Sequence, residues 1–552
     1  MINAIKSRAF QVIFLIILTS GAYINTLQNG FAWDDKDFLL NWPQIKNAED
    51  LPAYLSLPYL LIGDLPANHR GVYRPVRSVF YLVSYNFFGE NPFPYHIQSI
   101  IMHTLIVLVL YFLTMQLTKK SMLSFLVAAL FATHPIHTES VTNVTASFDN
   151  LGILFFFLSF YLYIKRKTLG SALYGFLAFF TYEMTLVLPL IVLLYEFVVN
   201  NYSLKKVLNK FHLYKHFILI LIVYILIRFI ILGIGNRADY LGIVWGIAAN
   251  QVRVGMPEIF LHYLSWMASP ISLTIARTLP ANLLTSFLNL LNKIDPTGNL
   301  VNVSGQVAFI FPIIYASVAL FIAFFFLKRY PLIFFAISWI IITLLPVSNI
   351  IPQGASLAER FLYIPSFGFV FLLGLLLYNG LLKYKRFAPF FTVLTISIIF
   401  FYSFQTLNRN FDWKNDKTIW QSAIKVDNTN PLPLRALASV YVRENEFEAG
   451  IELYKKALEV NYPSAQLNSE LGLAYEKKGD MQMAIKYQQK ALELSSIYYP
   501  SHIILGDIYL KQNKFEQAEA EYKKALEISK NDPRILLRLE EFQTLQEENK
   551  LR

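Results

Sequence analysis

Residues 93–139 decide how this chain folds, and they read FPYHIQSIIMHTLIVLVLYFLTMQLTKKSMLSFLVAALFATHPIHTE. The stretch holds two long apolar runs, and its only Lys or Arg residues are the adjacent pair Lys119 and Lys120 between them. About 20 apolar residues are enough for a helix to cross a hydrocarbon core of roughly 30 Å. Basic residues gather on the cytoplasmic side of membrane proteins. The sequence therefore predicts two spanning helices, 93–117 and 121–139, joined by a cytoplasmic turn.

Similar apolar runs lie on both sides of this pair and bring the predicted number of spans to eleven. With Lys6 and Arg8 in the cytoplasm, an odd number of spans places the C-terminus outside. The long loop of about 28–92 is then the first outer loop. Residues 256–292 are predicted to form an interfacial or re-entrant helix, or a short hairpin. The other nine predicted spans are 9–27, 148–164, 169–182, 184–200, 213–234, 306–327, 331–351, 361–382 and 387–405.

Composition agrees with a chain that lies mostly in lipid. Hydrophobic residues make up 55% and charged residues only 15%, against roughly 25% charged residues in soluble domains. The formal net charge is +11, but residues 408–552 carry 21 basic and 22 acidic side chains, so the excess belongs to the first 407 residues. An excess confined to an apolar region reflects membrane orientation and excludes nucleic-acid binding. The absence of cysteine excludes disulfides, thiol catalysis and Cys-ligated metals.

The tail after Asn408 is charged, rich in Ala and periodic. Tyr441, Tyr475 and Tyr509 follow one another at 34 residues, the period of the tetratricopeptide repeat, which is a pair of antiparallel helices. We predict a half-repeat at 413–426 and three repeats from about Leu432, so that 1–407 is a membrane domain and 408–552 a repeat domain. Stacked repeats offer a concave surface for a peptide or protein partner, or serve only as an assembly scaffold.

The charged side chains of the membrane region gather at the predicted outer ends of the spans, where ionisable groups are usually paired or functional. Asp34 and Asp35 follow the first span; adjacent carboxylates can act as a general base, bind a divalent metal, or be ordinary loop acids. Arg74 begins an amphipathic helix and presents a donor fork suited to phosphate, or pairs with these carboxylates.

A second set of polar residues follows the third span, in His134-Pro135-Ile136-His137-Thr138-Glu139, with Asp149 beyond it. Two histidines and a glutamate can bind metal, but no established ligand spacing is present. Hydrogen bonding to a phosphate or sugar, or helix capping near the membrane surface, is favoured. Glu183 lies at a turn between spans. Arg360 opens a later span, near Tyr363, and there suits an anionic group or pairs with Glu359 or Glu183.

These residues form an ordered set of short motifs that continues into the repeat tail. The motifs are Asn25, Asn29-Gly30-Phe31, Trp33-Asp34-Asp35, Tyr73-Arg74-Pro75, Asn91-Pro92-Phe93, Tyr95-His96, His134-Pro135, His137-Thr138-Glu139, Glu183-Met184, Arg360, Tyr363 and Pro365-Ser366. The set resembles the transmembrane and tetratricopeptide repeat-containing O-mannosyltransferase-like family, which belongs to the GT-C glycosyltransferases. Two positions depart from the family pattern, since Tyr182 replaces a basic residue and Ser147-Phe148 a Gly-Arg pair.

The resemblance implies an all-α protein of GT-C type with about eleven spans and a tetratricopeptide solenoid. It implies an inverting glycosyltransferase that takes a sugar, possibly mannose, from a polyprenyl- or dolichyl-phosphate donor and transfers it to a protein Ser/Thr hydroxyl on the extracytoplasmic face. The membrane is a bacterial cell membrane, or that of the endoplasmic reticulum in a eukaryote. No cofactor is expected beyond the donor lipid, although a divalent metal is compatible with the carboxylates.

Each candidate residue then takes a role in that reaction. Asp34, or else Asp35, is the expected general base, and Glu139, Asp149, Glu183 and Tyr363 support the site. Two other functions stay open: a non-catalytic membrane scaffold, which the two departures leave open, and a ligase or polymerase of lipid-linked glycans. Transporters place ionisable groups near the bilayer midplane, often in two related halves of the chain. A transporter is disfavoured because Arg228 is the main charge within a span and no symmetry between halves is evident. The residues expected to bind the donor phosphate are Arg74, His134, His137 and Arg360.

Overall fold

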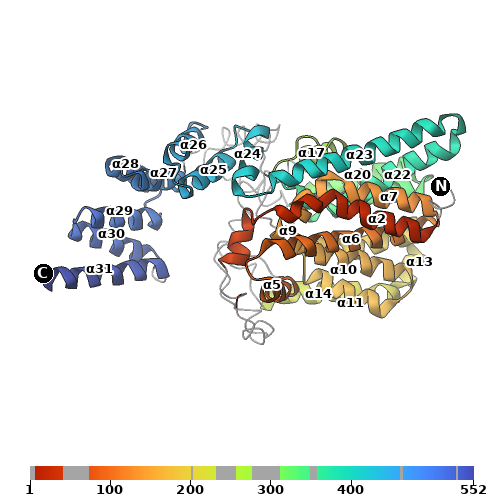
Figure 1. Ribbon diagram of the computed structural model, residues 1–552. Coiled ribbons are helices and arrows are strands. Elements are labelled where there is room, and N and C mark those ends of the chain that lie inside the picture. The colour runs from red at the N-terminus through yellow and green to blue at the C-terminus, as the bar shows by residue number, and fades with distance from the viewer. Residues whose placement is uncertain are drawn as a thin grey trace, which may run out of the picture. The chain divides into compact units, whose positions relative to one another are not determined.

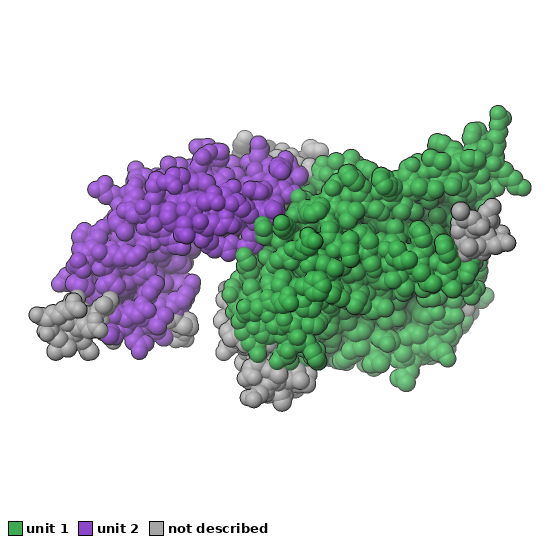
Figure 2. Space-filling model, viewed as in Figure 1, with its two compact units in different colours: residues 1–275, 279–415 green, residues 276–278, 416–552 purple. Residues whose placement is uncertain are grey.

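The computed structural model describes residues 7–41, 46, 74–200, 203–231, 256–275, 311–348, 357–460, 464–529 and 532–551. Within these ranges the regular elements are all helices, which confirms the predicted all-α class. The chain divides into two compact units (Figure 2), residues 1–275 with 279–415 and residues 276–278 with 416–552. The main division falls eight residues after the predicted boundary at 407/408, because the end of the last apolar helix packs on the first unit.

The first unit is a bundle of apolar helices. The predicted pair at its centre is α6 and α7, which lie side by side and also pack against α2 (Figure 1). Pro135 ends α7 earlier than predicted, at Thr133, and the chain continues after a bend of 52° as far as Thr142. The longer helices of the bundle are α2 (Arg8–Tyr23), α6 (Pro92–Thr118), α7 (Ser121–Thr133), α10 (Asp149–Ile164), α22 (Pro365–Lys383) and α23 (Ala388–Asp412).

Six helices of the described residues are long and apolar enough to cross a membrane, or seven if the bent pair is one span. The shorter helices fall within other predicted spans, so eleven crossings remain a prediction. Exposed aromatic side chains on α23, such as Phe390 and Phe400, fit a helix that faces lipid. These helices make the chain a multi-pass membrane protein. One of the six is α21 (Pro331–Thr343) together with the turn that follows it, as far as Ser348. The shorter helices are α11 (Thr168–Phe179), α12 (Leu188–Val198), α14 (Lys215–Ile225) with η9 (Leu226–Ile231), and α20 (Phe311–Leu327).

Short elements between the long helices carry the polar side chains. The loop predicted at 28–92 contains a π-helix, η2 (Lys36–Leu40), and the predicted amphipathic helix as α5 (Pro75–Phe88). The ambiguous segment contains α17 (Met256–Ala268), and 276–292 lies outside the described residues. The remaining elements are η1 (Ile24–Gln28), η6 (Pro135–His137), α8 (Thr138–Thr142), α9 (Val144–Ser147), η7 (Glu183–Val187), α13 (Leu204–Asn209), η8 (Phe211–Leu213), η12 (Pro346–Ser348), η13 (Glu359–Leu362) and η14 (Lys385–Phe387).

The second unit consists of helix pairs at the predicted 34-residue period. The alanines of that period, such as Ala457 and Ala491, are fully buried where the helices meet. Gly472 is required by a close approach, since a Cβ there would lie 2.6 Å from the side chain of Gln488. The helices are α24 (Asp416–Val426), α25 (Pro431–Arg443), α26 (Phe447–Glu459), α27 (Ala465–Lys478), α28 (Met481–Leu494), α29 (Tyr499–Lys511), α30 (Phe515–Ile528) and α31 (Pro533–Leu551).

Candidate functional site

Asp35 has a local structural role. Its carboxylate accepts the backbone N–H of Ala32 at 3.0 Å and that of Thr145 at 2.7 Å, and the residue is almost fully buried. Burial raises the pKa of Asp35 to about 6, although the backbone donors oppose this rise. With one oxygen on each donor, Asp35 fastens the chain after the first helix to the start of α9.

Asp34 is half-buried and differs from its neighbour in its electrostatics. Burial raises the pKa of Asp34 to about 7; the positive charge of Arg360 opposes the rise, and the carboxylates of Asp35, Glu139 and Asp37 add to it. Trp33, which precedes it, has a φ of 52°, a conformation that a bulky residue seldom adopts and that is often found at functional sites. Asp34 is therefore poised to accept a proton near neutral pH.

Arg360 faces these acids from η13. Its guanidinium pairs with Glu139, whose second oxygen accepts the backbone N–H of Arg360 at 2.9 Å. The guanidinium also lies 5.7 Å from the ring of Trp33, and the side chain stays 23% exposed. We call Asp34, Asp35, Glu139 and Arg360 the carboxylate-rich cluster, because it contains three acids and one arginine. This arrangement confirms neither of the sequence alternatives that paired Arg360 with Glu359 or Glu183.

Arg74 belongs to a second group. Its Nε donates to Glu183 at 2.6 Å and its Nη1 to Asp149 at 3.1 Å, while the guanidinium lies over the ring of Tyr182 at 5.0 Å. Burial by itself raises the pKa of Glu183, but Arg74 and Arg228 outweigh it and hold that pKa below its ordinary value. The sequence placed Arg74 beside Asp34 or Asp35 as one alternative, whereas its partners are Asp149 and Glu183.

Two further arginines complete this group. Arg77 lies 3.0 Å from Asp149, and Arg228 donates to Glu183 at 3.2 Å from the η9 turn. From the sequence, Arg228 is recognised only as a charge within a span. The apolar residues around it are the signal that could have marked it as paired. We call Arg74, Arg77, Arg228, Asp149 and Glu183 the arginine-rich cluster. It holds three arginines and two carboxylates, so one positive charge is in excess.

The two clusters touch through Thr145. Its backbone N–H donates to Asp35, and its carbonyl accepts from Arg77 at 3.1 Å. Tyr182 lies within the electrostatic range of both Arg74 and Arg360, although burial is the main cause of its raised pKa. Gly152 of α10 permits this position, because a Cβ there would lie 2.9 Å from the Cβ of Tyr182. The excess positive charge of the arginine-rich cluster can thus attract an anion, while a carboxylate of the neighbouring cluster accepts a proton beside it.

The histidines make their hydrogen bonds to residues outside both clusters. His134 accepts the N–H of Ile136 at one ring nitrogen and contacts the carbonyl of Met267 at the other, at 2.9 Å. His137 Nε2 pairs with Ser366 at 2.8 Å, and the Tyr363 hydroxyl pairs with His103. Both ring nitrogens of His134 are thus taken by the backbone, which leaves it no group for a phosphate. Among the described residues no group of three or more His, Asp or Glu side chains is placed to hold a metal ion.

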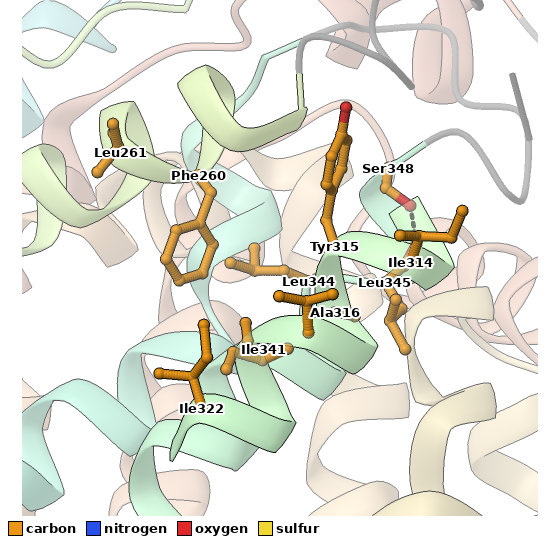
Figure 3. Close-up of a pocket in the computed structure, with 12 residues that line it drawn as sticks. Phe260, Leu261, Ile314, Tyr315, Ala316, Ile322, Ile341, Leu344, Leu345 and Ser348 are labelled. Carbon is orange, nitrogen blue, oxygen red and sulfur yellow. Dashed lines mark hydrogen bonds between the residues drawn. The ribbon is translucent and has the colours of Figure 1, made fainter. Parts of the chain in front are cut away.

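An apolar cavity of about 600 Å3 lies between α17, α20 and α21 (Figure 3). Phe260, Leu261, Ile322 and Ile341 are among the residues that line it, and Tyr315 and Ser348 carry the polar side-chain atoms of its lining. Ser348 ends η12, which contacts η7, and η7 begins with Glu183 of the arginine-rich cluster. The apolar lining of the cavity is suited to a hydrocarbon chain.

Comparison with known proteins agrees with the repeat domain and with the motifs. Models of the tetratricopeptide repeat match residues 436–462 and 463–531. The chain is 25% identical over 482 residues to protein O-mannosyl-transferase TMTC3 of Mus musculus, an alignment that covers 82% of this chain and 51% of that protein. It is 24% identical over 437 residues to protein O-mannosyl-transferase F38B6.6 of Caenorhabditis elegans, covering 76% of this chain and 58% of that one.

Other relatives carry similar names. Protein O-mannosyl-transferase TMTC2 of Homo sapiens is 23% identical over 521 residues, covering 79% of this chain and 60% of that protein. The chain thus spans little more than half the length of the curated relatives it matches. The resemblance carried by the sequence motifs is confirmed: the chain is a relative of the transmembrane and tetratricopeptide repeat-containing O-mannosyltransferase-like family.

Proposed function

We propose that this protein is a membrane glycosyltransferase of GT-C type that transfers a sugar from a polyprenyl-phosphate donor to a protein hydroxyl. The observation that carries the proposal is the contact, through Thr145, between a cluster with excess positive charge and a cluster with excess carboxylates. A group-transfer enzyme needs both a site for its anionic leaving group and a base for its nucleophile. The names of the relatives make mannose the sugar to test first.

The donor binds with its phosphate toward the arginines. Arg360 is the most accessible of the four arginines in the two clusters, with 23% of its side chain exposed. The exposed fractions of the others are 14% for Arg74, 9% for Arg77 and 3% for Arg228. We assign Arg360 the direct contact with phosphate, and Arg74 acts through the excess charge of its cluster. The apolar cavity beside η12 supports a lipid-linked donor, because it can take part of the isoprenoid chain.

The reaction is a single displacement at the anomeric carbon. Asp34 takes the proton of the acceptor hydroxyl, and the oxygen forms a bond to the anomeric carbon from the face opposite the phosphate. The bond between that carbon and the phosphate oxygen breaks, and the polyprenyl phosphate leaves with both bonding electrons. Attack from the opposite face inverts the configuration. The arginines stabilise the negative charge that grows on the phosphate.

The repeat domain is proposed to hold the acceptor polypeptide. Its helix pairs form a stack of the kind that binds extended segments. The acceptor is then a Ser- or Thr-bearing chain, and the site works on the extracytoplasmic face with the N-terminus in the cytoplasm. The basic residues beside the predicted spans support this orientation.

Radiolabelled donors test the proposal directly. The full chain, purified into lipid nanodiscs, is incubated with polyprenyl-phosphate mannose and with other polyprenyl-phosphate sugars, together with Ser/Thr peptides. We expect release of polyprenyl phosphate and label on the peptide, both lost in Asp34→Asn. Release that persists in Asp34→Asn would reject the base, and no release with any donor would favour a non-catalytic scaffold.

A further inference from the structure

A buried amide, that of Asn410, helps to hold the end of α23. The side-chain NH2 of Asn410 donates to the carbonyl of Ala22 at 3.0 Å and to Oδ1 of Asn25 at 2.7 Å. Its side-chain oxygen accepts from the Thr142 hydroxyl at 3.0 Å, and its backbone carbonyl accepts from Asn29 at 3.0 Å. Asn410 is fully buried, and its partners lie 268 to 388 residues away in the sequence. One residue thus joins three segments: α23 itself, residues 22–29, and Thr142 of α8.

Two of these segments lead directly to the carboxylate-rich cluster. Asn29 lies five residues before Asp34, and the next residue, Gly30, donates its N–H to the carbonyl of Lys414 at 3.0 Å. Thr142 ends α8, the short helix that carries Glu139, the partner of Arg360. The segment before Asp34 and α8, whose Glu139 pairs with Arg360, are therefore both hydrogen-bonded to the end of α23.

A neighbouring ion pair connects α23 to η13, the element that carries Arg360. Arg409 donates to Glu359 at 2.7 Å and to Asp412 at 2.7 Å. Glu359 directly precedes Arg360 in η13, so the backbone that carries the phosphate-binding arginine also rests on α23. Every element that carries a member of the carboxylate-rich cluster then has a contact with this helix end, either directly or through Thr142.

We propose that Asn410 is a positioning residue that fixes Asp34 relative to Arg360. This inference rests on the proposed function. An amide offers two N–H donors and an acceptor on one small side chain, whereas a hydroxyl of similar size has one donor. Each partner of the Asn410 amide is itself buried or part-buried. Removing the amide takes this partner from the carbonyl of Ala22, Oδ1 of Asn25 and the hydroxyl of Thr142, whereas the bond from Asn29 to the backbone carbonyl stays. The loss loosens the segments that carry these groups. A shift of about 1 Å between base and phosphate site is enough to slow a reaction roughly a hundredfold.

The same helix provides a matched control. Thr406, one turn before Asn410, is also fully buried and donates to the carbonyl of Thr133 at 2.8 Å, which is a contact with α7 and not with the cluster. Asn410→Ala should lower kcat about tenfold to a hundredfold, with the KM for the donor lipid changed less than threefold. Thr406→Val should keep the kcat of the wild type. Equal loss in the two variants would overturn the proposal.

The pH profile separates positioning from mere loss of folded protein. Asp34 is faced by Arg360, Asp35, Glu139 and Asp37, and water that enters a loosened loop restores hydration to its carboxylate. The acid limb of kcat should then move to lower pH in Asn410→Ala. A variant that only reduces the amount of folded enzyme keeps the limb in place, and that result would contradict a positioning role.

Hydrogen exchange tests the same idea without any activity. In the full chain in nanodiscs, amides of residues 29–35 and 138–145 should exchange at least threefold faster in Asn410→Ala than in the wild type, while α10 stays unchanged. Unchanged exchange at 29–35 would overturn the inference even if transfer is normal. If the wild type transfers no sugar, the proposed function fails, and faster exchange still establishes the anchoring part.

A milder pair of variants covers the case in which Asn410→Ala does not fold. Thr142→Val keeps the shape of the side chain and removes one of the hydrogen bonds to Asn410, whereas Thr142→Ser keeps the hydroxyl. We expect kcat to fall severalfold in Thr142→Val and to recover in Thr142→Ser. Equal kcat in both variants and the wild type would contradict the role given to the amide.

Discussion

The two charged clusters contain similar residues and have opposite balances. The arginine-rich cluster has three arginines for two carboxylates, and Arg74 in it is shared between Asp149 and Glu183. The carboxylate-rich cluster has one arginine for three acids, and the pKa of its Asp34 rises to about 7 because of burial and of the neighbouring acids. The difference teaches that the balance of charge, more than the residue types, decides where a carboxylate becomes a base. The phosphate is proposed to be held by Arg360 of the carboxylate-rich cluster, with the excess positive charge of the arginine-rich cluster beside it.

The largest expected effect distinguishes the two neighbouring aspartates. Asp34→Asn removes the base and should lower transfer about 10²- to 10⁴-fold, the usual contribution of a general base, without lowering the unfolding temperature. Asp35→Asn should cost roughly 1–3 kcal/mol of stability, because an amide cannot accept both backbone N–H groups that the carboxylate accepts. Transfer assays beside thermal unfolding measure both. The opposite pattern would exchange the roles of the two residues.

The next effect compares the arginines of the two clusters. Arg360→Gln should lower kcat by about a hundredfold, since a charged contact to the leaving phosphate is lost. Arg74→Gln should mainly lower stability, by about 3 kcal/mol, because two buried carboxylates each lose a partner. Arg166→Gln serves as the control; its side chain is 43% exposed and pairs with Glu196, outside both clusters. If the free energy of unfolding of Arg74→Gln equals that of the wild type, the arginine-rich cluster does not stabilise the fold.

The pH profile gives a smaller and more specific effect. Because a base must be deprotonated and the pKa of Asp34 is raised to about 7, kcat should fall as the pH drops below about 7. Arg360 opposes that rise, so Arg360→Gln should move the acid limb to higher pH. Asp37 adds to it, so Asp37→Asn should move the limb slightly to lower pH. Shifts of equal sign in the two variants would contradict this electrostatic account.

The smallest effect on chemistry is expected from the repeat domain. Gly472→Ala places a Cβ 2.6 Å from Gln488 and 3.1 Å from the carbonyl of Ala484, and should destabilise the array by about 1–3 kcal/mol. Release of polyprenyl phosphate with a small hydroxyl acceptor should stay at the wild-type rate, whereas transfer to a polypeptide should weaken. Gly21→Ala, where nothing lies within 4 Å, is the matched glycine control for unfolding.

The sequence by itself predicted the parts of the molecule that depend on local patterns. The apolar runs around Lys119 and Lys120 became α6 and α7, and the 34-residue period became helix pairs with Ala457 and Ala491 at their contacts. Hydrophobicity and period act within one helix or one repeat, so they can be read along the chain. The candidate residues Asp34, Arg74, Glu139 and Arg360 were also identified from their place at the ends of spans.

Only the tertiary structure decided which of these residues meet. Arg74 pairs with Asp149 and Glu183, and Arg360 pairs with Glu139. Both ring nitrogens of His134 contact backbone groups. Asn410, which no motif singled out, joins segments up to 388 residues apart. Partners of a buried charge or amide are chosen by the packing of whole helices, because desolvation makes each such group take whichever complement the fold brings near. No local pattern in the sequence carries that information.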